Sequence, residues 1–362
     1  MRNYDICIIG GGASGLAAAA SLSSHFDTVL LEKNRILGRK IMATGGGRCN
    51  ITNTACAHCD LTLEFFKSLG MELYHDSEGR YYPYSNQARD VVRVLEDAAE
   101  KKGVEVILES GVTKIQKKSE GFRIVAGKSS FSAKTVILAC GGKAAPALGT
   151  TGDGYGLARS LGHETTTIYP ILTGIECGDL KDLKGVRARG TVRLFREEKL
   201  LAEETGEIQF TEDGISGICV MNLTMYITAE KGMPVRKSLQ RYHLELDLAP
   251  DFSQAEMQQR ATSFGILSYA LSRRVSLEKI KGWKLPVCGV KGWKNAQCTA
   301  GGIRLDGGDL ATMESRLVPG LYLTGELLDI QGKCGGFNLQ NAWETGIRAA
   351  EHLNAIAKIE VK

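Results

Sequence analysis

The sequence has no long apolar run and no recognisable leader. No apolar stretch approaches the length of roughly 20 residues that a membrane-spanning helix needs. Residues 1–3 lead directly into an apolar stretch that is too short for the apolar region of a signal peptide. We therefore expect a cytoplasmic protein with no membrane partner.

An excess of one charge is also absent. The 362 residues include 45 Lys and Arg and 41 Asp and Glu, which gives a formal net charge of +4. The two signs are interspersed along the chain, whereas proteins that bind nucleic acid usually carry a basic excess or stripe. We therefore expect a small-molecule substrate and no nucleic-acid partner, and the sequence leaves the oligomeric state open.

A repeated CxxC motif, as found in many zinc sites, is missing. The ten cysteines are spread along the chain, and the one local pair is Cys56 and Cys59. Thiols of a cytoplasmic protein are normally reduced rather than joined in a disulfide framework. The pair is either a redox or metal-binding dithiol or, as the polar residues around it favour, an incidental loop pair, and we predict no metal site.

The stretch from Tyr4 to Glu32 predicts the first half of a dinucleotide-binding fold. An apolar strand is followed by a glycine turn, a helix of small residues and a second strand that ends at Glu32. Gly10 permits the turn, Gly12 lets backbone N–H groups approach a diphosphate, and Gly15 lets the helix lie close to the sheet. Glu32 lies 20 residues after Gly12, where a carboxylate binds a ribose 2′-OH and repels the 2′-phosphate of NADP.

Further glycine clusters indicate other places where the backbone comes close to a ligand. The chain contains 43 glycines, and several of them fall at 45–47, 141–142, 301–302 and 335–336. A long polar loop follows the ribose-binding strand, and loops of this length in compact domains usually carry function. Its Arg39 and Lys40 have the charge to meet phosphates.

A second strand–GxGxxG–helix unit does not occur in the sequence. The glycines at 214–217 have the wrong spacing, and the pair at 141–142 lacks a third glycine. We therefore expect no separate NAD(P) domain, so NAD(P)H would act only as a transient electron donor.

Changes in pattern along the chain predict two domains. We expect an α/β Rossmann-like nucleotide-binding domain over 1–161 and 299–362, with an inserted substrate or cap domain over 162–298. Within the insert, 162–248 and 285–298 are expected to be β-rich, and 249–284 a short helical subdomain with a helical stretch from Ser253 to about Lys281. A small antiparallel element is expected within 104–133, and separate strands at 130–133, 135–140, 199–204 and 207–211.

Taken together, the motifs resemble those of a known group, the BaiN/YhiN-like family of FAD-dependent flavoproteins. This family belongs to the flavoproteins with two dinucleotide-binding domains and includes NAD(P)/FAD-dependent and aminoacetone-oxidase-like oxidoreductases. The resemblance rests on blocks that keep their order along nearly the whole chain: Gly10–Gly15 with Glu32, 38–40, 44–50, Gly141-Gly142, 152–155, 210–211 with 214–217, 312–315, Gly325-Glu326 with Asp329, and 335–338. The helical part of the insert is shorter than is usual in that family, so no substrate is carried over by name.

The resemblance implies FAD, held between the first strand–helix unit and the returning C-terminal segment. The motifs and the resemblance together predict FAD contacts at Gly10, Gly12, Ala13, Ser14, Gly15, Glu32, Lys33, Arg39, Lys40, Thr44, Gly45, Gly46, Gly47, Arg48, Cys49, Asn50, Val112, Ala139, Gly141, Gly142, Asp153, Gly325, Glu326, Asp329, Gly335, Gly336, Phe337, Asn338 and Leu339. A helix that begins near Asn338 would point its amides at the flavin and stabilise the negative charge of the reduced form.

The catalytic acid or base is not singled out by the sequence. His75, Tyr84 and Lys333 are the candidates, and Arg48, Cys49 and Tyr81 lie in similar positions. Each of these residues is equally suited to packing or to contact with a flavin.

The function that the motifs favour is transfer of a hydride between the flavin and a small organic substrate, including reduction of a conjugated double bond with NAD(P)H. An FAD-dependent amine-type oxidase that uses oxygen shares every binding motif, and a flavin-binding redox sensor without turnover is a third reading. Flavin-dependent RNA modification would require salt-sensitive RNA binding, which interspersed charge does not favour.

Overall fold

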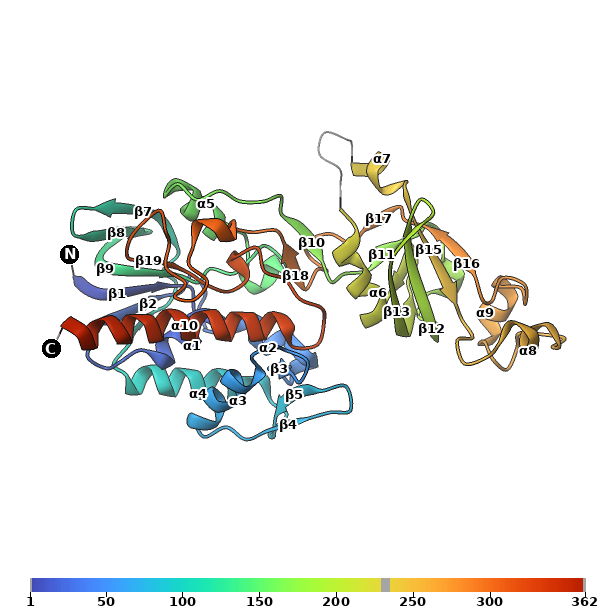
Figure 1. Cartoon of the computed structure of the whole chain (residues 1–362), viewed down its shortest axis with the longest axis horizontal. Coiled ribbons are helices and arrows are strands. Elements are labelled where there is room, and N and C mark those ends of the chain that lie inside the picture. Colours follow the sequence, from blue (N-terminus) through green and yellow to red (C-terminus); the bar gives the residue numbers. More distant parts are fainter. Residues whose placement is uncertain (1, 229–234, 361–362) are drawn as a thin grey trace. The chain divides into compact units, whose positions relative to one another are not determined.

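The computed structural model describes residues 2–228 and 235–360 (Figure 1). The chain forms two compact units, the first made of Met1–Tyr169 and Cys298–Lys362 and the second of Pro170–Gln297. Residues 229–234 of the expected insert, and residues 1 and 361–362 of the expected nucleotide-binding domain, lie outside the described residues.

A parallel sheet forms the centre of unit 1. β1 (Asn3–Ile9) lies between β2 (Thr28–Leu31) and β9 (Ser129–Leu138), β6 (Glu105–Ile107) extends the sheet beside β2, and β19 (Leu321–Leu323) pairs in parallel with the end of β9. All four residues of β2 are buried, as expected for a strand covered on both faces. The predicted α/β class with a Rossmann-type parallel sheet is confirmed.

Three helices of unit 1 pack beside one another (Figure 1). α1 (Ala13–Ser21) contacts both α4 (Ala88–Lys101) and α10 (Phe337–Glu360). The approach of α10 to α1 requires a glycine, because a Cβ at Gly346 would lie 2.2 Å from the carbonyl oxygen of Ser14. The fully buried Trp343 of α10 meets Phe66 of α3 (Cys59–Ser68) edge to face, with ring centres 5.3 Å apart.

An antiparallel element extends the same sheet, as predicted for residues 112–133. Residues 105–107 of the expected element do not belong to it, because they form β6, which pairs in parallel with β2. β7 (Val112–Lys118) pairs with β8 (Gly121–Ala126), and β8 pairs with β9. The two strands expected at 130–133 and 135–140 are one continuous strand, because β9 changes its antiparallel partner from β8 to the parallel strand β19 without a break. α5 (Asp153–Ser160) lies against β7.

A small second sheet in unit 1 adjoins the glycine loop. Its strand order is β3–β5–β4, with β3 at Thr52–Asn53, β4 at Leu73–His75 and β5 at Arg80–Pro83. The short helix α2 (Arg39–Ala43) precedes this sheet along the chain.

Unit 2 is built on an antiparallel sheet of seven strands. Their order is β16 (Trp283–Pro286), β15 (Tyr242–Asp247), β12 (Arg187–Arg196), β13 (Lys199–Phe210), β14 (Gly214–Ser216), β11 (Ile175–Glu176) and β17 (Gly289–Val290). The strands expected at 199–204 and 207–211 form the single strand β13. Unit 2 also contains the helices α6 (Ile218–Leu223) and α7 (Val235–Leu239). The short strands β10 (Tyr169–Ile171) and β18 (Cys298–Ala300) lie where the chain passes between the units.

The prediction of a continuous helical stretch from Ser253 to about Lys281 is wrong. The structure has two short helices there, α8 (Gln254–Gln258) and α9 (Tyr269–Arg274), joined by irregular chain. Ser253 and Glu256 form a capping box at the start of α8. Gly265 adopts a φ of +96° between the helices, which a continuous helix does not allow.

None of the helices in the described part of the chain combines the length and the apolar character that a membrane span requires.

Candidate functional site

The turn between β1 and α1 uses the three glycines of its GxGxxG motif in two different ways. A Cβ at Gly15 would lie 1.9 Å from the carbonyl oxygen of Gly10, and a Cβ at Gly10 would lie 2.5 Å from that of Ala139. These two glycines are required by packing. Gly12 differs, because a Cβ there would meet no atom within 4 Å. Gly12 is also the residue before the first turn of α1, where free amides attract an anion.

The carboxylate of Glu32 is held by the chain at the end of β2. Its Oε2 accepts a hydrogen bond from the backbone N–H of Gly11 at 2.7 Å. Its Oε1 accepts from the backbone N–H of Asn34 at 2.8 Å and from the Asn34 side chain. Glu32 is 7% exposed, so its carboxylate is fixed beside the glycine turn.

Two other predicted contact residues, Lys33 and Arg39, join neighbouring elements near Glu32. Lys33 forms an ion pair with Asp153 at the start of α5, with 2.5 Å between Nζ and Oδ2. Arg39 donates from its guanidinium to the side chain of Asn34 and to the carbonyl oxygen of Ala147, each at 3.0 Å. These bonds bring the ends of β2, α2 and α5 together.

The glycine loop 44–50 has an unusual backbone conformation. Gly45, Gly46 and Gly47 all have positive φ, between 57° and 87°, and the buried Cys49 has a φ of 64°. A Cβ at Gly46 or at Gly47 would meet no atom within 4 Å. The loop therefore presents bare backbone to open space, which suits close approach of a planar ligand.

Arg48 and Tyr82 stabilise this loop from one side. The Arg48 guanidinium lies 4.4 Å from the centre of the Tyr82 ring and donates from Nε to the carbonyl oxygen of Gly45 at 3.3 Å. Burial raises the pKa of the neighbouring Cys49 thiol to about 12. Cys49 therefore stays protonated at neutral pH and is a poor nucleophile there.

A polar cluster forms where Gly142 meets the segment after β19. Lys40 donates to Oε2 of Glu326 at 2.7 Å, and the backbone N–H of Thr299 donates to the other oxygen at 2.8 Å. Burial lowers the pKa of Lys40, but the Glu326 carboxylate outweighs this effect and holds the pKa above its ordinary value. A Cβ at Gly142 would lie 2.7 Å from the Glu326 carboxylate, so the glycine allows the pair to reach the sheet edge.

The segment before α10 returns to the glycine loop. Gly335 and Gly336 have φ of 112° and 102°, and a Cβ at Gly336 would lie 2.6 Å from the backbone of Thr52. Asn53 donates to the carbonyl oxygen of Gly335 at 3.0 Å. The side chain of Asn338 closes the loop upon itself, accepting from the N–H of Gly332 at 2.9 Å and donating to its carbonyl oxygen at 2.8 Å. The N-terminus of α10 is thereby fixed beside the loop 44–50.

The remaining predicted contact residues lie at the carboxyl edge of the sheet or next to it. Ala139 is buried and donates to the carbonyl oxygen of Ile9 at 2.9 Å. Gly325 has a φ of 70°, and a Cβ there would lie 2.6 Å from Oγ of Ser14. The carboxylate of Asp329 accepts from the hydroxyl of Thr166 at 2.9 Å. Val112 differs, since it opens β7 in the antiparallel element.

The three candidate acid–base residues are not brought together into one cluster. His75 is exposed at the end of β4, with its ring 5.3 Å from that of Tyr81. Tyr84 is 74% exposed and packs edge to face on Tyr74. Lys333 is exposed in the loop before α10.

Several residues that position the site were not identified from the sequence. The buried Gln340 accepts from the hydroxyl of Thr52 at 2.6 Å and donates to the carbonyl oxygen of His58 at 2.8 Å. Trp343 donates from its ring to the carbonyl oxygen of Ile51 at 3.0 Å. The signal that could have found Gln340 is a polar residue one turn into a helix that follows two glycines.

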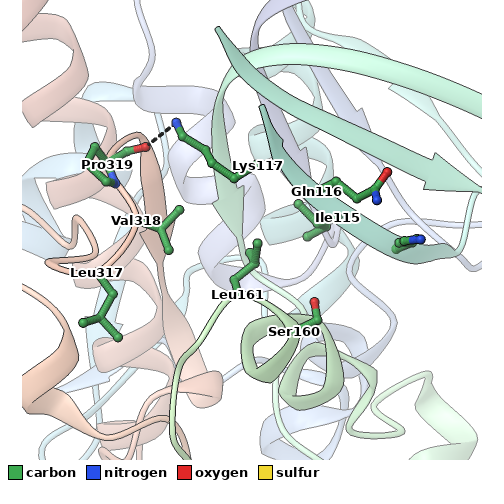
Figure 2. Close-up of a pocket in the computed structure, with 9 residues that line it drawn as sticks. Ile115, Gln116, Lys117, Ser160, Leu161, Leu317, Val318 and Pro319 are labelled. Carbon is green, nitrogen blue, oxygen red and sulfur yellow. Dashed lines mark hydrogen bonds between the residues drawn. The ribbon is translucent and has the colours of Figure 1, made fainter. Parts of the chain in front are cut away.

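A separate cavity of about 440 Å³ lies on another part of unit 1 (Figure 2). It is lined by β7, the end of α5 and residues 317–319, and Lys117 reaches across to the carbonyl oxygen of Pro319 at 2.8 Å. No residue predicted to contact FAD lines it, so this cavity is distinct from the candidate cofactor site.

The fold, the glycine turn after β1 and the carboxylate of Glu32 at the end of β2 define a class, the Rossmann-type dinucleotide-binding proteins. A model of the HI0933-like protein Rossmann domain matches residues 4–61 and 58–352. The chain belongs to this HI0933-like family, and its predicted resemblance to a family of FAD-dependent flavoproteins is confirmed.

Two kinds of relative are similar to the chain along almost its whole length. A 3-dehydro-bile acid delta(4,6)-reductase of Clostridium scindens is 36% identical over 405 residues, covering 95% of this chain and 97% of that protein. A ribosomal RNA dihydrouridine synthase of Escherichia coli is 26% identical, covering 98% of this chain and 99% of that protein.

A solved structure shows the same fold. The 3-ketosteroid-delta4-(5alpha)-dehydrogenase of Rhodococcus jostii is 16% identical, with a TM-score of 0.53 over 98% of this chain and 97% of that protein. The predicted class of FAD-dependent oxidoreductase is confirmed by the family match together with the 36% identical reductase.

Proposed function

We propose that this protein reduces a carbon–carbon double bond conjugated to a carbonyl group, with FAD as the cofactor and NAD(P)H as the electron donor. The observation that carries the proposal is the open space in unit 1 along the glycine turn after β1 and the glycine loop 44–50, here called the cradle. A Cβ would meet no atom within 4 Å at Gly12, which lies beside Glu32, or at Gly46 and Gly47, which belong to the loop next to the N-terminus of α10. The names of both kinds of relative, a delta(4,6)-reductase and a dihydrouridine synthase, describe enzymes that add hydrogen to a double bond.

The residues around the cradle fit FAD. The amides at the start of α1 would bind the diphosphate, and Glu32 would bind the ribose of the adenosine. Lys40 and Glu326 pair beside Gly142 at the sheet edge, where they would hold the ribityl chain. Bound FAD would supply the hydride-transfer chemistry that links NAD(P)H to the β carbon of the substrate.

The chain itself would supply two further effects. The N-terminus of α10 would stabilise negative charge that develops on the reduced cofactor. The α carbon of the substrate also needs a proton, for which His75, Tyr84 and Lys333 remain the candidate donors.

An anaerobic two-step experiment tests the proposal. The holoenzyme is first reduced with NADH or NADPH and then mixed with 4-androstene-3,17-dione, whose double bond is conjugated to a ketone. We expect the flavin absorbance to return and the product to contain two more hydrogens. A steroid with an isolated double bond is the control and should leave the flavin reduced. Rapid reoxidation by oxygen together with reduction by amines, and not by NAD(P)H, would contradict the proposal and support an oxidase.

A second candidate substrate is a uracil ring within RNA. Its supporting observation is the similarity to the dihydrouridine synthase over 98% of this chain. The 5,6 double bond of uracil is also conjugated to a carbonyl group, so the same residues would serve. Formation of dihydrouridine in ribosomal RNA by the NAD(P)H-reduced enzyme, measured by mass spectrometry of the nucleosides, tests this candidate.

A further inference from the structure

Positive charge is concentrated in one stretch of the sequence of unit 2, contrary to the expectation that the two signs are interspersed. Residues 260–294, here called the basic segment, contain one acidic residue, Glu278. They contain eight cations: Arg260, Arg273, Arg274, Lys279, Lys281, Lys284, Lys291 and Lys294. The net charge of the basic segment is therefore +7, whereas that of the whole chain is +4.

Three of these cations form ion pairs. Lys281 pairs with Asp247 at 2.7 Å, Lys291 pairs with Asp213, and Arg274 pairs with Asp182 at 3.3 Å. The other five are exposed and form no ion pair within the described part of the chain, although Arg260 lies 5.4 Å from the centre of the Phe252 ring and near the carboxylate of Glu256. These five are Arg260, Arg273, Lys279, Lys284 and Lys294. Their charge is therefore available to an anionic partner.

Two large aromatic rings lie exposed in the same segment. Phe264 is 57% exposed and Tyr269 is 63% exposed, and the two rings meet edge to face with centres 6.0 Å apart. The Arg273 guanidinium lies 5.7 Å from the centre of the Tyr269 ring and donates to its hydroxyl at 3.1 Å. Tyr269 is the first residue of α9, and the side chain of Ser268 caps that helix. The ring of Tyr269 is thus presented from a fixed helix end.

Exposed aromatic rings beside unpaired cations are the combination that binds single-stranded nucleic acid. Bases stack on the rings, and Lys and Arg follow the phosphates. RNA differs from duplex DNA in offering unstacked bases in loops and bulges. We propose that the basic segment of unit 2 is a docking surface for single-stranded RNA, with Phe264 and Tyr269 as stacking residues and Arg260, Arg273 and Lys279 as phosphate contacts.

This proposal deepens the second candidate function, because an enzyme that acts on RNA needs a surface that holds the strand. It opposes the expectation, drawn from the interspersed charge, that the chain binds no nucleic acid. RNA binding is measured separately from flavin reduction, so a failure of docking does not depend on whether the chain reduces a double bond.

Fluorescence anisotropy of a labelled uridine-rich oligoribonucleotide with the full-length holoprotein tests the proposal. We expect saturable binding that weakens steeply as salt is raised. The triple variant R260Q/R273Q/K279Q should weaken binding at least tenfold and lower the slope of log Kd against log salt by about 2, since each lost contact to a single strand contributes about 0.7. The double variant F264A/Y269A should also bind at least tenfold more weakly while keeping most of the salt slope.

A matched variant of unit 1 controls for net charge. K67Q/K118Q/K128Q removes three exposed cations that lie outside the predicted FAD contacts and should bind RNA like the wild type. Unchanged flavin content and circular dichroism would show that the variants of the basic segment are folded. The proposal is overturned if the wild type does not bind RNA at low salt, or if the two triple variants bind equally well. It is also overturned if vesicles containing phosphatidylserine bind through Phe264 and Tyr269 while RNA does not.

Discussion

Units 1 and 2 both contain tightly packed glycines, but they use them for different purposes. In unit 2, a Cβ at Gly214 would lie 2.0 Å from the carbonyl oxygen of Ile175 on the neighbouring strand. In unit 1, the equally tight Gly15 lies next to Gly12, which faces open space. A glycine that packs against backbone is explained by the fold alone. Glycines with nothing opposite them also occur in exposed turns, such as Gly70 and Gly178. The open space at Gly12 indicates a ligand because it lies at the start of α1 beside the buried carboxylate of Glu32.

Substitutions at these two glycines of unit 1 should have the largest effects. Gly15→Ala places a methyl group 1.9 Å from a backbone oxygen, so we expect loss of FAD and a loss of stability of about 3 kcal/mol or more. Gly12→Ala meets no atom, and its φ of −89° suits alanine. The apoprotein of Gly12→Ala should therefore melt within about 2 °C of the wild type. It should nevertheless bind FAD at least tenfold more weakly, because the methyl group would meet the diphosphate. Thermal melts of the apoproteins and FAD titrations measure both effects, and wild-type affinity of Gly12→Ala for FAD would refute the assigned role.

An intermediate effect is expected from Lys281→Met in unit 2. Lys281 pairs with Asp247, which is 6% exposed, and also donates to the carbonyl oxygens of Ala249 and Phe252 at 2.7 Å. Removing the cation leaves a buried carboxylate without its partner, which costs about 3 kcal/mol. We expect faster proteolysis within residues 249–284 and unchanged FAD content, because no predicted FAD contact lies in unit 2. Lys284→Met, at an exposed position of β16, is the control and should be cleaved at the wild-type rate.

The smallest effect concerns the pH dependence of unit 1. His163 is 2% exposed and lies 2.9 Å from Oγ of Ser315, and burial lowers its pKa. The unfolded chain therefore binds a proton at this residue more readily than the folded chain does, so stability falls as pH drops below about 6.5. Between pH 7.5 and pH 5.5 we expect the melting temperature of His163→Gln to fall by a few degrees less than that of the wild type. His243→Gln in unit 2 is the control, and an identical pH dependence in all three proteins would contradict the expectation.

The motifs that the sequence predicted correctly are those set by local backbone geometry. The glycine turn after β1 and the position of Glu32 follow from the length of one strand–helix–strand unit, so their spacing is visible in the chain. The pairs Lys40–Glu326 and Thr52–Gln340 join residues separated by 286 and 288 positions. No local pattern reveals such contacts, because they depend on how distant elements pack.

The short helices of unit 2 were missed for a related reason. Polar residues and good helix formers between Ser253 and Lys281 favour a helix, but Met257, Leu267, Leu271 and Ile280 are buried in the core of unit 2 instead. Burying these side chains bends the chain at Gly265. Tertiary packing thus overrides helix propensity, which is a weak preference per residue.

The identity and amount of the bound flavin test the central claim most directly. The purified protein, reconstituted with FAD and freed of excess cofactor, is heated, and the released flavin is identified by chromatography and quantified against the protein. The account predicts about one FAD per chain for the wild type and a large loss of FAD for Gly12→Ala, although the apoprotein of that variant remains folded. Release of FMN, or absence of flavin from the folded and reconstituted wild type, would contradict the account.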